Sequence, residues 1–119
     1  MYKLLIVDDE PIIRRGIKTL AILPEIGIDE IFEAGNADKC LEIVDKEHID
    51  IIMLDINMPN TDGLTLAKIL KEKNKKIAII MITGYDYFEY MQTAIRIGVD
   101  DYLLKPVNKT DIELVLRRI

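Results

Sequence analysis

With 119 residues, half of them hydrophobic and 31% charged, the chain has the length and composition of one globular domain rather than of a disordered segment. Its net charge of -5, with no basic stripe to offset it, argues against nucleic-acid binding by these residues themselves. The apolar runs are too short to span a bilayer and the N-terminus does not resemble a signal peptide, so we expect a cytoplasmic protein without membrane contacts.

Five apolar runs of strand length alternate along the chain with segments whose apolar residues recur at helical spacing. The first three strands are KLLIV at 3–7, EIFEA at 30–34 and DIIMLD at 50–55, and the last two are IAIIMIT at 77–83 and DYLLK at 101–105. The first two helices are marked by Ile13, Gly16, Ile17, Leu20 and Leu23, and by Ala37, Cys40, Leu41 and Val44. The last three are marked by Leu64, Ala67 and Leu70, by Phe88, Met91 and Ile95, and by Ile112, Val115, Leu116 and Ile119.

Strict alternation of strand and helix predicts the α/β class, with parallel strands joined by right-handed crossovers. Near-continuous apolar runs such as LLIV and IAIIMI are typical of strands that are buried from both sides. We therefore predict one domain over residues 1–119, built as a doubly wound, five-stranded parallel sheet with five helices divided between its two faces.

Local signals agree with these boundaries. Pro11 suits the first turn of a helix, where its missing N–H is not needed, and Asp62 is a candidate cap for the third helix. Cys40, the only cysteine, falls on the apolar side of the second helix, so we interpret it as a small core residue rather than a reactive thiol.

Reactive side chains stand where four of the predicted strands end. Asp8 and Asp9 follow the first strand, Asp55 ends the third, Thr83 ends the fourth and Lys105 ends the fifth. In open α/β sheets, ligands bind outside the carboxyl ends of the strands, so these groups should converge on one rim. Each residue alone is a weak signal, and their joint placement is what indicates a site.

The adjacent acids indicate the chemistry of that site. Two carboxylates about 4 Å apart repel each other by roughly 4 kcal/mol at an effective dielectric near 20, so a cation is expected between them. Mg²⁺ prefers hard oxygen ligands and suits Asp8 and Asp9. Asp55 can then be both a metal ligand and a nucleophile toward phosphorus, while Lys105 and Thr83 stabilise the charge that builds on the phosphoryl oxygens.

At these residues the sequence resembles the CheY-like receiver domain of two-component response regulators. The resemblance covers the whole chain, through LLIVDDEP, DIIMLDINMPNTDGL and IIMITGYDYFEYMQTAIRIGVDDYLLKP. It implies a flavodoxin-like fold with strand order 2-1-3-4-5. It also implies that Asp55 is the phosphoacceptor, and that Asp8, Asp9, Asp55 and the backbone carbonyl of Asn57 are the ligands of Mg²⁺.

The same resemblance implies a switch and partners. Thr83 would move toward the phosphoryl group as Tyr102 swings inward, and Lys105, whose bond to Pro106 is typically cis in this family, would pair with the phosphate. The phosphodonor would be a histidine kinase. Because the protein's own phosphorylation is its signal, we do not expect a conventional enzyme.

The output face of this family consists of the fourth helix, the fifth strand and the fifth helix. Here the fourth helix also carries Tyr87, Tyr90 and Ile97, and we hypothesise homodimerisation through that face, enhanced by phosphorylation. The C-terminal half looks most like receivers attached to AraC-type regulators. The chain is therefore expected to be the N-terminal part of a longer transcription regulator, which contacts DNA only through a further C-terminal domain.

Other functions remain open at this point. A stand-alone receiver would act by protein–protein interaction alone. A haloacid-dehalogenase-like phosphatase uses similar groups, but its nucleophile belongs to an Asp-x-Asp motif at the first strand. A flavodoxin-type electron carrier would need a phosphate-binding loop where Asp8, Asp9 and Glu10 stand. His48, beside Glu47 and Asp50, is interpreted as a surface residue rather than a phosphodonor.

Overall fold

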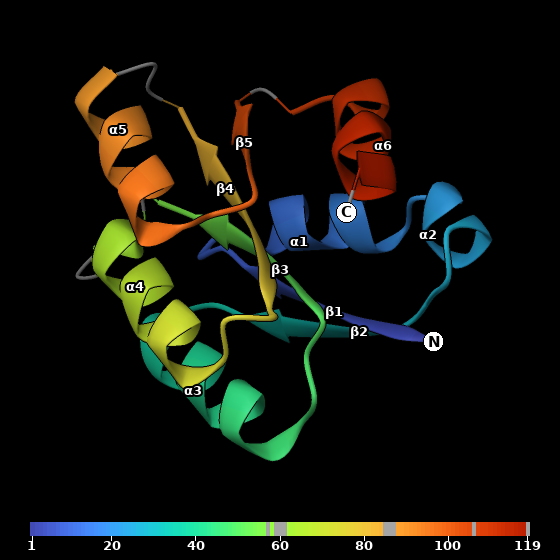
Figure 1. The fold of residues 1–119 in the computed structure, drawn as a ribbon. Coiled ribbons are helices and arrows are strands. Elements are labelled where there is room, and N and C mark those ends of the chain that lie inside the picture. The colour runs from blue at the N-terminus through green and yellow to red at the C-terminus, as the bar shows by residue number, and fades with distance from the viewer. Residues whose placement is uncertain (57, 59–61, 85–87, 106, 119) are drawn as a thin grey trace.

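Strands and helices follow one another in the part of the chain that a computed structural model describes (Figure 1), namely residues 1–56, 58, 62–84, 88–105 and 107–118, with residues 88–91 as backbone only. The strands are β1 (Tyr2–Val7), β2 (Ile28–Ala34), β3 (Ile51–Asp55), β4 (Ala78–Thr83) and β5 (Asp101–Leu104). The helices of the described residues are α1 (Pro11–Lys18), α2 (Ile22–Glu25), α3 (Ala37–Lys46), α4 (Gly63–Lys73), α5 (Phe88–Ile97) and α6 (Lys109–Arg118).

All five strands pair in parallel, in the order β2-β1-β3-β4-β5, which confirms the predicted doubly wound sheet. β2 lies on one side of β1 and β3 lies on the other, so the strand order reverses around β1. In the register of β1 with β3, Val7 is opposite Leu54. Asp8 and Asp55 therefore follow paired residues at the centre of the sheet, where an open α/β sheet leaves a crevice for ligands.

Each face of the sheet is covered by three helices, with α3, α4 and α5 on one side and α1, α2 and α6 on the other (Figure 1). Because successive strand residues point to opposite faces, β1 sends Leu5 and Val7 into the first layer and Leu4 and Ile6 into the second. Both layers are buried, which explains why the inner strands β3 and β4 are apolar almost throughout.

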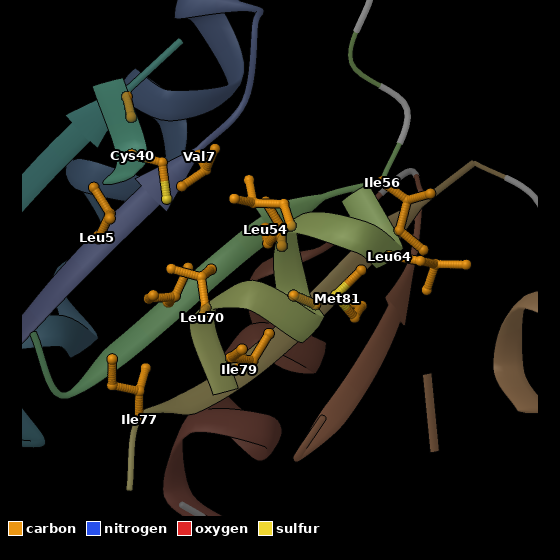
Figure 2. Close-up of a cluster of buried hydrophobic side chains, with 14 of the residues drawn as sticks. Leu5, Val7, Cys40, Leu54, Ile56, Leu64, Leu70, Ile77, Ile79 and Met81 are labelled. Carbon is orange, nitrogen blue, oxygen red and sulfur yellow. The ribbon is translucent and has the colours of Figure 1, made fainter. Parts of the chain in front are cut away.

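Figure 2 shows the layer beneath α3 and α4, where Leu54 and Met81 of the central strands face Leu70 of α4. Cys40 of α3 lies in the same layer and has no exposed surface. Burial raises the pKa of its thiol to about 12, so the thiol stays protonated at neutral pH. The prediction that Cys40 is a core residue is confirmed.

The helix starts also follow the predicted signals. Pro11 occupies the first turn of α1. Asp62 caps α4, because its carboxylate accepts hydrogen bonds from the backbone N–H of Leu64 at 3.0 Å and from the Thr65 hydroxyl at 2.8 Å. None of the helices that the structure describes is both long and apolar enough to cross a membrane.

The prediction of five helices was wrong, because the first apolar stripe is divided between α1 and α2. One continuous helix would place Pro24 in its interior, where the ring clashes with the Leu20 carbonyl and offers it no N–H. A new helix that begins at Ile22 puts Pro24 in the first turn instead. At the end of α1, the Thr19 hydroxyl donates to the carbonyls of Arg15 and Gly16.

The buried face of α5 was also misplaced. Ile95, predicted as a core residue, is 72% exposed, whereas Ala94 is 1% exposed. Ile97, predicted on the outer flank, packs against the layer shown in Figure 2. The small side chain of Ala94 lets the helix approach the sheet, and Ile95, about 100° further around the helix, points away from it. Tyr87 and the side chains of Phe88, Tyr90 and Met91 lie outside the described residues, as does Ile119.

Candidate functional site

The carboxyl ends of β1, β3 and β5 bring two aspartates and one lysine together. The Lys105 ammonium donates a hydrogen bond to Asp55 Oδ2 at 3.1 Å and lies 3.8 Å from Asp8 Oδ2. Residues 97 and 50 positions apart in the sequence meet because parallel strands all end at one edge. Sequence reasoning predicted this convergence of Asp8, Asp55 and Lys105.

Backbone hydrogen bonds continue the sheet just past the strand ends and so hold these side chains in place. The Asp8 N–H donates to the Ala34 carbonyl at 3.0 Å, and the Lys105 N–H donates to the Thr83 carbonyl at 2.7 Å. Each functional side chain therefore projects from backbone that belongs to the rigid sheet rather than to a free loop.

Asp8 is a buried carboxylate whose two oxygens differ. Its side chain is 2% exposed. Oδ1 accepts a hydrogen bond from the Glu10 N–H at 2.9 Å, whereas Oδ2 accepts none from any described residue. Burial raises the pKa of Asp8 to about 6, and the charges of Asp55 and Asp9 act in the same direction. The Glu10 N–H and the Lys105 ammonium offset only part of that rise.

Lys105 supplies a positive charge to the site. Burial favours its neutral form, but the hydrogen bond to Asp55 and the charges of Asp55 and Asp8 outweigh that effect, so the pKa of Lys105 is raised. The ammonium is therefore protonated throughout the physiological range. Two buried carboxylates, those of Asp8 and Asp55, lie within 3.8 Å of the same ammonium.

The residues around Asp8 fit a divalent cation. Asp8, Asp9 and Glu10 each offer a carboxylate oxygen, and these oxygens lie within 4.8 Å of one another. Asp8 supplies the buried oxygen without a hydrogen bond, while Asp9 and Glu10 are exposed. A few carboxylates open to solvent suit Mg²⁺, which keeps several of its waters. Of the other predicted ligands, Asp55 lies near Asp8, because the Lys105 ammonium contacts both carboxylates. Asn57 lies outside the described residues.

The two predicted switch residues lie on neighbouring strands. Thr83 ends β4 and has no exposed surface, and the β3–β4 register places Asp55 opposite Ile82, the residue before it. Tyr102 of β5 is paired with Met81 and is partly buried against the layer of Figure 2. Pro106 lies outside the described residues.

Gly63 is a site residue that sequence reasoning missed. A Cβ on Gly63 would lie 2.5 Å from the Ile56 Cα and 3.1 Å from the Asp55 carbonyl oxygen, so only glycine lets α4 begin against the end of β3. The available signal was a glycine at the first position of a helix, directly after its Asp62 cap.

Arg14 of α1 was also missed. Its Nη1 donates to the backbone carbonyl of Asp8 at 2.6 Å, and its Nε donates to Glu33 Oε1 of β2 at 3.2 Å. Nothing in the sequence distinguishes Arg14 from its neighbour Arg15, because both belong to an ordinary charged helix surface.

His48 is a surface residue, as predicted. Its side chain is 78% exposed, and its Nε2 lies 3.4 Å from the Asp50 carboxylate at the opposite end of the sheet from Asp55. It has no part in the cluster around Asp55.

Comparison with known proteins identifies the family to which the chain is similar. The family model described as "Response regulator receiver domain" matches residues 4–117. The chain is 33% identical over 119 residues to the transcriptional regulatory protein HptR of Staphylococcus aureus, which covers all of this chain and 46% of that protein. The chain thus spans slightly less than half the length of the curated relatives it matches first.

Solved structures of response regulators have the same fold as this chain. The receiver (REC) domain of AraT, a response regulator from Geobacillus stearothermophilus, is 42% identical, with a TM-score of 0.89 over 98% of this chain and 91% of that one. A response regulator from Burkholderia pseudomallei, whose crystal structure holds a phosphorylated aspartic acid and a calcium ion, is 27% identical. Its TM-score is 0.85 over 98% of this chain and 66% of that one.

Proposed function

Because the chain belongs to the response regulator receiver family, we propose that it is a phosphoacceptor switch in which Asp55 takes a phosphoryl group from a histidine kinase. The observation that carries this proposal is the buried Asp55 carboxylate at a strand end, 3.1 Å from the Lys105 ammonium and beside the acids of the β1 end. The family places this chemistry in signalling, and the product is a state of the protein rather than a released compound.

In the proposed transfer, an Asp55 carboxylate oxygen attacks phosphorus in line with the phosphohistidine. An O–P bond forms as the N–P bond breaks, and the electron pair leaves with the histidine nitrogen, which takes up a proton. Asp8 and Asp9 would hold Mg²⁺ together with Asp55 and the Asn57 carbonyl. When bound, Mg²⁺ supplies positive charge for the phosphoryl oxygens.

Lys105 and Thr83 have separate roles in this proposal. The Lys105 ammonium, which already contacts Asp55, pairs with the phosphate, and the Thr83 hydroxyl donates a hydrogen bond to it. Phosphate that binds better to one of two packings shifts the population toward that packing, and the partly buried Tyr102 on β5 follows Thr83.

We further propose that the chain is the receiver of a longer, cytoplasmic transcription regulator with an AraC-type DNA-binding domain. Support comes from the relatives, which are about twice as long and include a protein named as a transcriptional regulator. The exposed surface of α5, β5 and α6 would transmit the signal by pairing with a second copy, and Ile95, Leu104 and Leu114 supply its exposed apolar side chains.

Intact-mass spectrometry tests the central step. After incubation with Mg²⁺ and a small acyl phosphate, the wild-type chain should gain the mass of one phosphoryl group, and Asp55→Asn should gain none. Asp45→Asn is the matched control, because Asp45 is an exposed carboxylate on α3 whose partner is Lys73. Equal labelling of the wild type and Asp55→Asn would refute the proposal.

A further inference from the structure

Arg14 links the acidic loop after β1 to the neighbouring strand β2. Its Nη1 donates to the carbonyl oxygen of Asp8 at 2.6 Å, and its Nε donates to Glu33 Oε1 at 3.2 Å. The Arg14 side chain is only 18% exposed. A short, charged hydrogen bond from a partly buried guanidinium is among the stronger contacts that a backbone carbonyl can have.

The carbonyl that Arg14 binds belongs to the peptide between Asp8 and Asp9. Because a peptide is planar, fixing the direction of its oxygen also fixes the adjoining N–H and the start of the Asp9 residue. On the other side of the same turn, the Asp8 carboxylate accepts the Glu10 N–H at 2.9 Å. The two contacts together set how the carboxylates of Asp8 and Asp9 are presented to a shared ion.

Glu33 makes this contact compatible with cation binding. A lone guanidinium beside the acidic loop would repel a divalent ion, but Glu33 neutralises Arg14 through its contact with Nε. Glu33 also accepts a hydrogen bond from Lys18 at 3.3 Å. Although partial burial alone would raise the pKa of Glu33, its bonds to Lys18 and Arg14 lower it, so Glu33 is ionised at neutral pH.

We propose that Arg14, anchored by Glu33, is a positioning residue of the Mg²⁺ site. It contacts no metal ligand atom and acts through the backbone between Asp8 and Asp9. The inference rests on the proposed function for the identity of the metal ligands. It adds that ligand geometry at the end of β1 depends on a salt bridge between α1 and β2.

The direction in which Mg²⁺ affinity changes when Arg14 is replaced distinguishes a positioning role from a purely electrostatic one. Removing a positive charge near the site favours a divalent cation, so electrostatics alone predicts that Arg14→Met binds Mg²⁺ as tightly as wild type or more tightly. If Arg14 positions the ligands, Arg14→Met should instead bind Mg²⁺ more weakly. Loss of a residue that orients metal ligands typically lowers metal affinity by about 10–100-fold. Arg15→Met removes the same charge one residue along α1, at an exposed side chain.

Isothermal titration of Mg²⁺ into each metal-free variant tests the proposal. We expect Arg14→Met to bind about tenfold or more weakly, Arg14→Lys to recover part of the loss through its single ammonium donor, and Arg15→Met to keep the wild-type affinity. Urea unfolding without metal is the second readout, because a merely structural role would lower stability and leave the affinity of the folded protein unchanged.

Each outcome is decisive. Wild-type affinity in folded Arg14→Met would overturn the role of Arg14 and leave the proposed function intact. Absence of Mg²⁺ binding by the wild type itself would overturn the metal site of the proposed function. Should Arg14→Met fail to fold, Arg14→Gln removes the same charge with a polar side chain and must show the same loss of affinity.

Discussion

Asp8 Oδ2 is a buried carboxylate oxygen that accepts no hydrogen bond from the described part of the chain. Such a group destabilises the folded protein unless a ligand compensates it. Lys105, at 3.8 Å, lies beyond hydrogen-bonding distance and is already engaged by Asp55. The position of Asp8 is therefore explained by what it would bind rather than by what it contributes to folding.

This predicts that Asp8→Asn stabilises the metal-free protein at neutral pH. The folded pKa of Asp8 is about 6 and the ordinary value is 3.8, so the folded state favours the protonated form. The free-energy cost of the charged Asp8 carboxylate in the folded state is absent below its ordinary pKa of 3.8 and complete above about pH 6. We expect a gain in unfolding free energy of about 2–3 kcal/mol at pH 7.5, shrinking as the pH falls toward 4. Urea unfolding of both proteins at several pH values measures it.

Two controls accompany that measurement. Asp9→Asn removes the neighbouring charge from an exposed side chain, which keeps its water in the folded state, so its effect should be smaller. Saturating Mg²⁺ should stabilise the wild type and not Asp8→Asn. A variant at position 8 that is less stable than wild type at pH 7.5 without metal would contradict this account.

At the scale of single residues, sequence reasoning succeeded where a side chain ends a strand. The convergence of Asp8, Asp55 and Lys105 was predictable because parallel strands end at one edge and carry their last residues there. Arg14 was not predictable, because its role depends on which backbone atom it approaches across the fold, and neither residue type nor spacing encodes that.

At the scale of elements, the start of α4 lies close against the end of β3. Asp62 caps the helix, and Gly63 leaves space for the backbone of Asp55 and Ile56. The helix then buries Leu66 and Leu70 in the layer of Figure 2. The position of Asp55 thus depends on a helix that follows it in the chain as well as on the strand that contains it.

Gly63→Ala should therefore destabilise the protein, by about 1–3 kcal/mol, because its Cβ would lie 2.5 Å from the Ile56 backbone. Gly16→Ala is a matched control within α1, where a Cβ would meet nothing within 4 Å, and it should stabilise by about 0.5–1 kcal/mol. Thermal or urea unfolding distinguishes the two. Equal effects of the two substitutions would show that the approach of α4 to β3 is not tight.

The errors in element prediction have local causes. The stripe from Ile13 to Leu23 has helical spacing throughout, and the spacing alone does not register the break that Pro24 imposes. In α5, hydrophobicity favoured Ile95 for the core, but close packing on the sheet selected the smaller Ala94. Both errors changed a helix boundary or a helix face and left the order of elements intact.

At the scale of the whole molecule, alternation determined most of the architecture. Five parallel strands with helices between them allow few arrangements once crossovers are right-handed, and the observed order is among these. The two hydrophobic layers on either side of the sheet support the same central strands. This rigid centre holds Asp8 and Asp55, while exposed apolar residues remain on α5, β5 and α6.

Phosphorylation should increase self-association through that outer surface. Leu114 of α6 is 57% exposed and Leu104 of β5 is 43% exposed. In sedimentation velocity, the phosphorylated protein should form a dimer that Leu114→Glu abolishes. Ile12→Glu is the matched control, because Ile12 is 78% exposed on α1, and it should leave the dimer unchanged. An identical monomer with and without phosphate would contradict the expected dimer.

The location of the phosphoryl group tests the central claim most directly. Borohydride reduction of the protein after treatment with Mg²⁺ and a small acyl phosphate converts an aspartyl phosphate into homoserine, which peptide mass spectrometry assigns to a position. We expect homoserine at position 55, with Asp8 and Asp9 unchanged. Homoserine at any other aspartate, with Asp55 intact, would contradict this assignment.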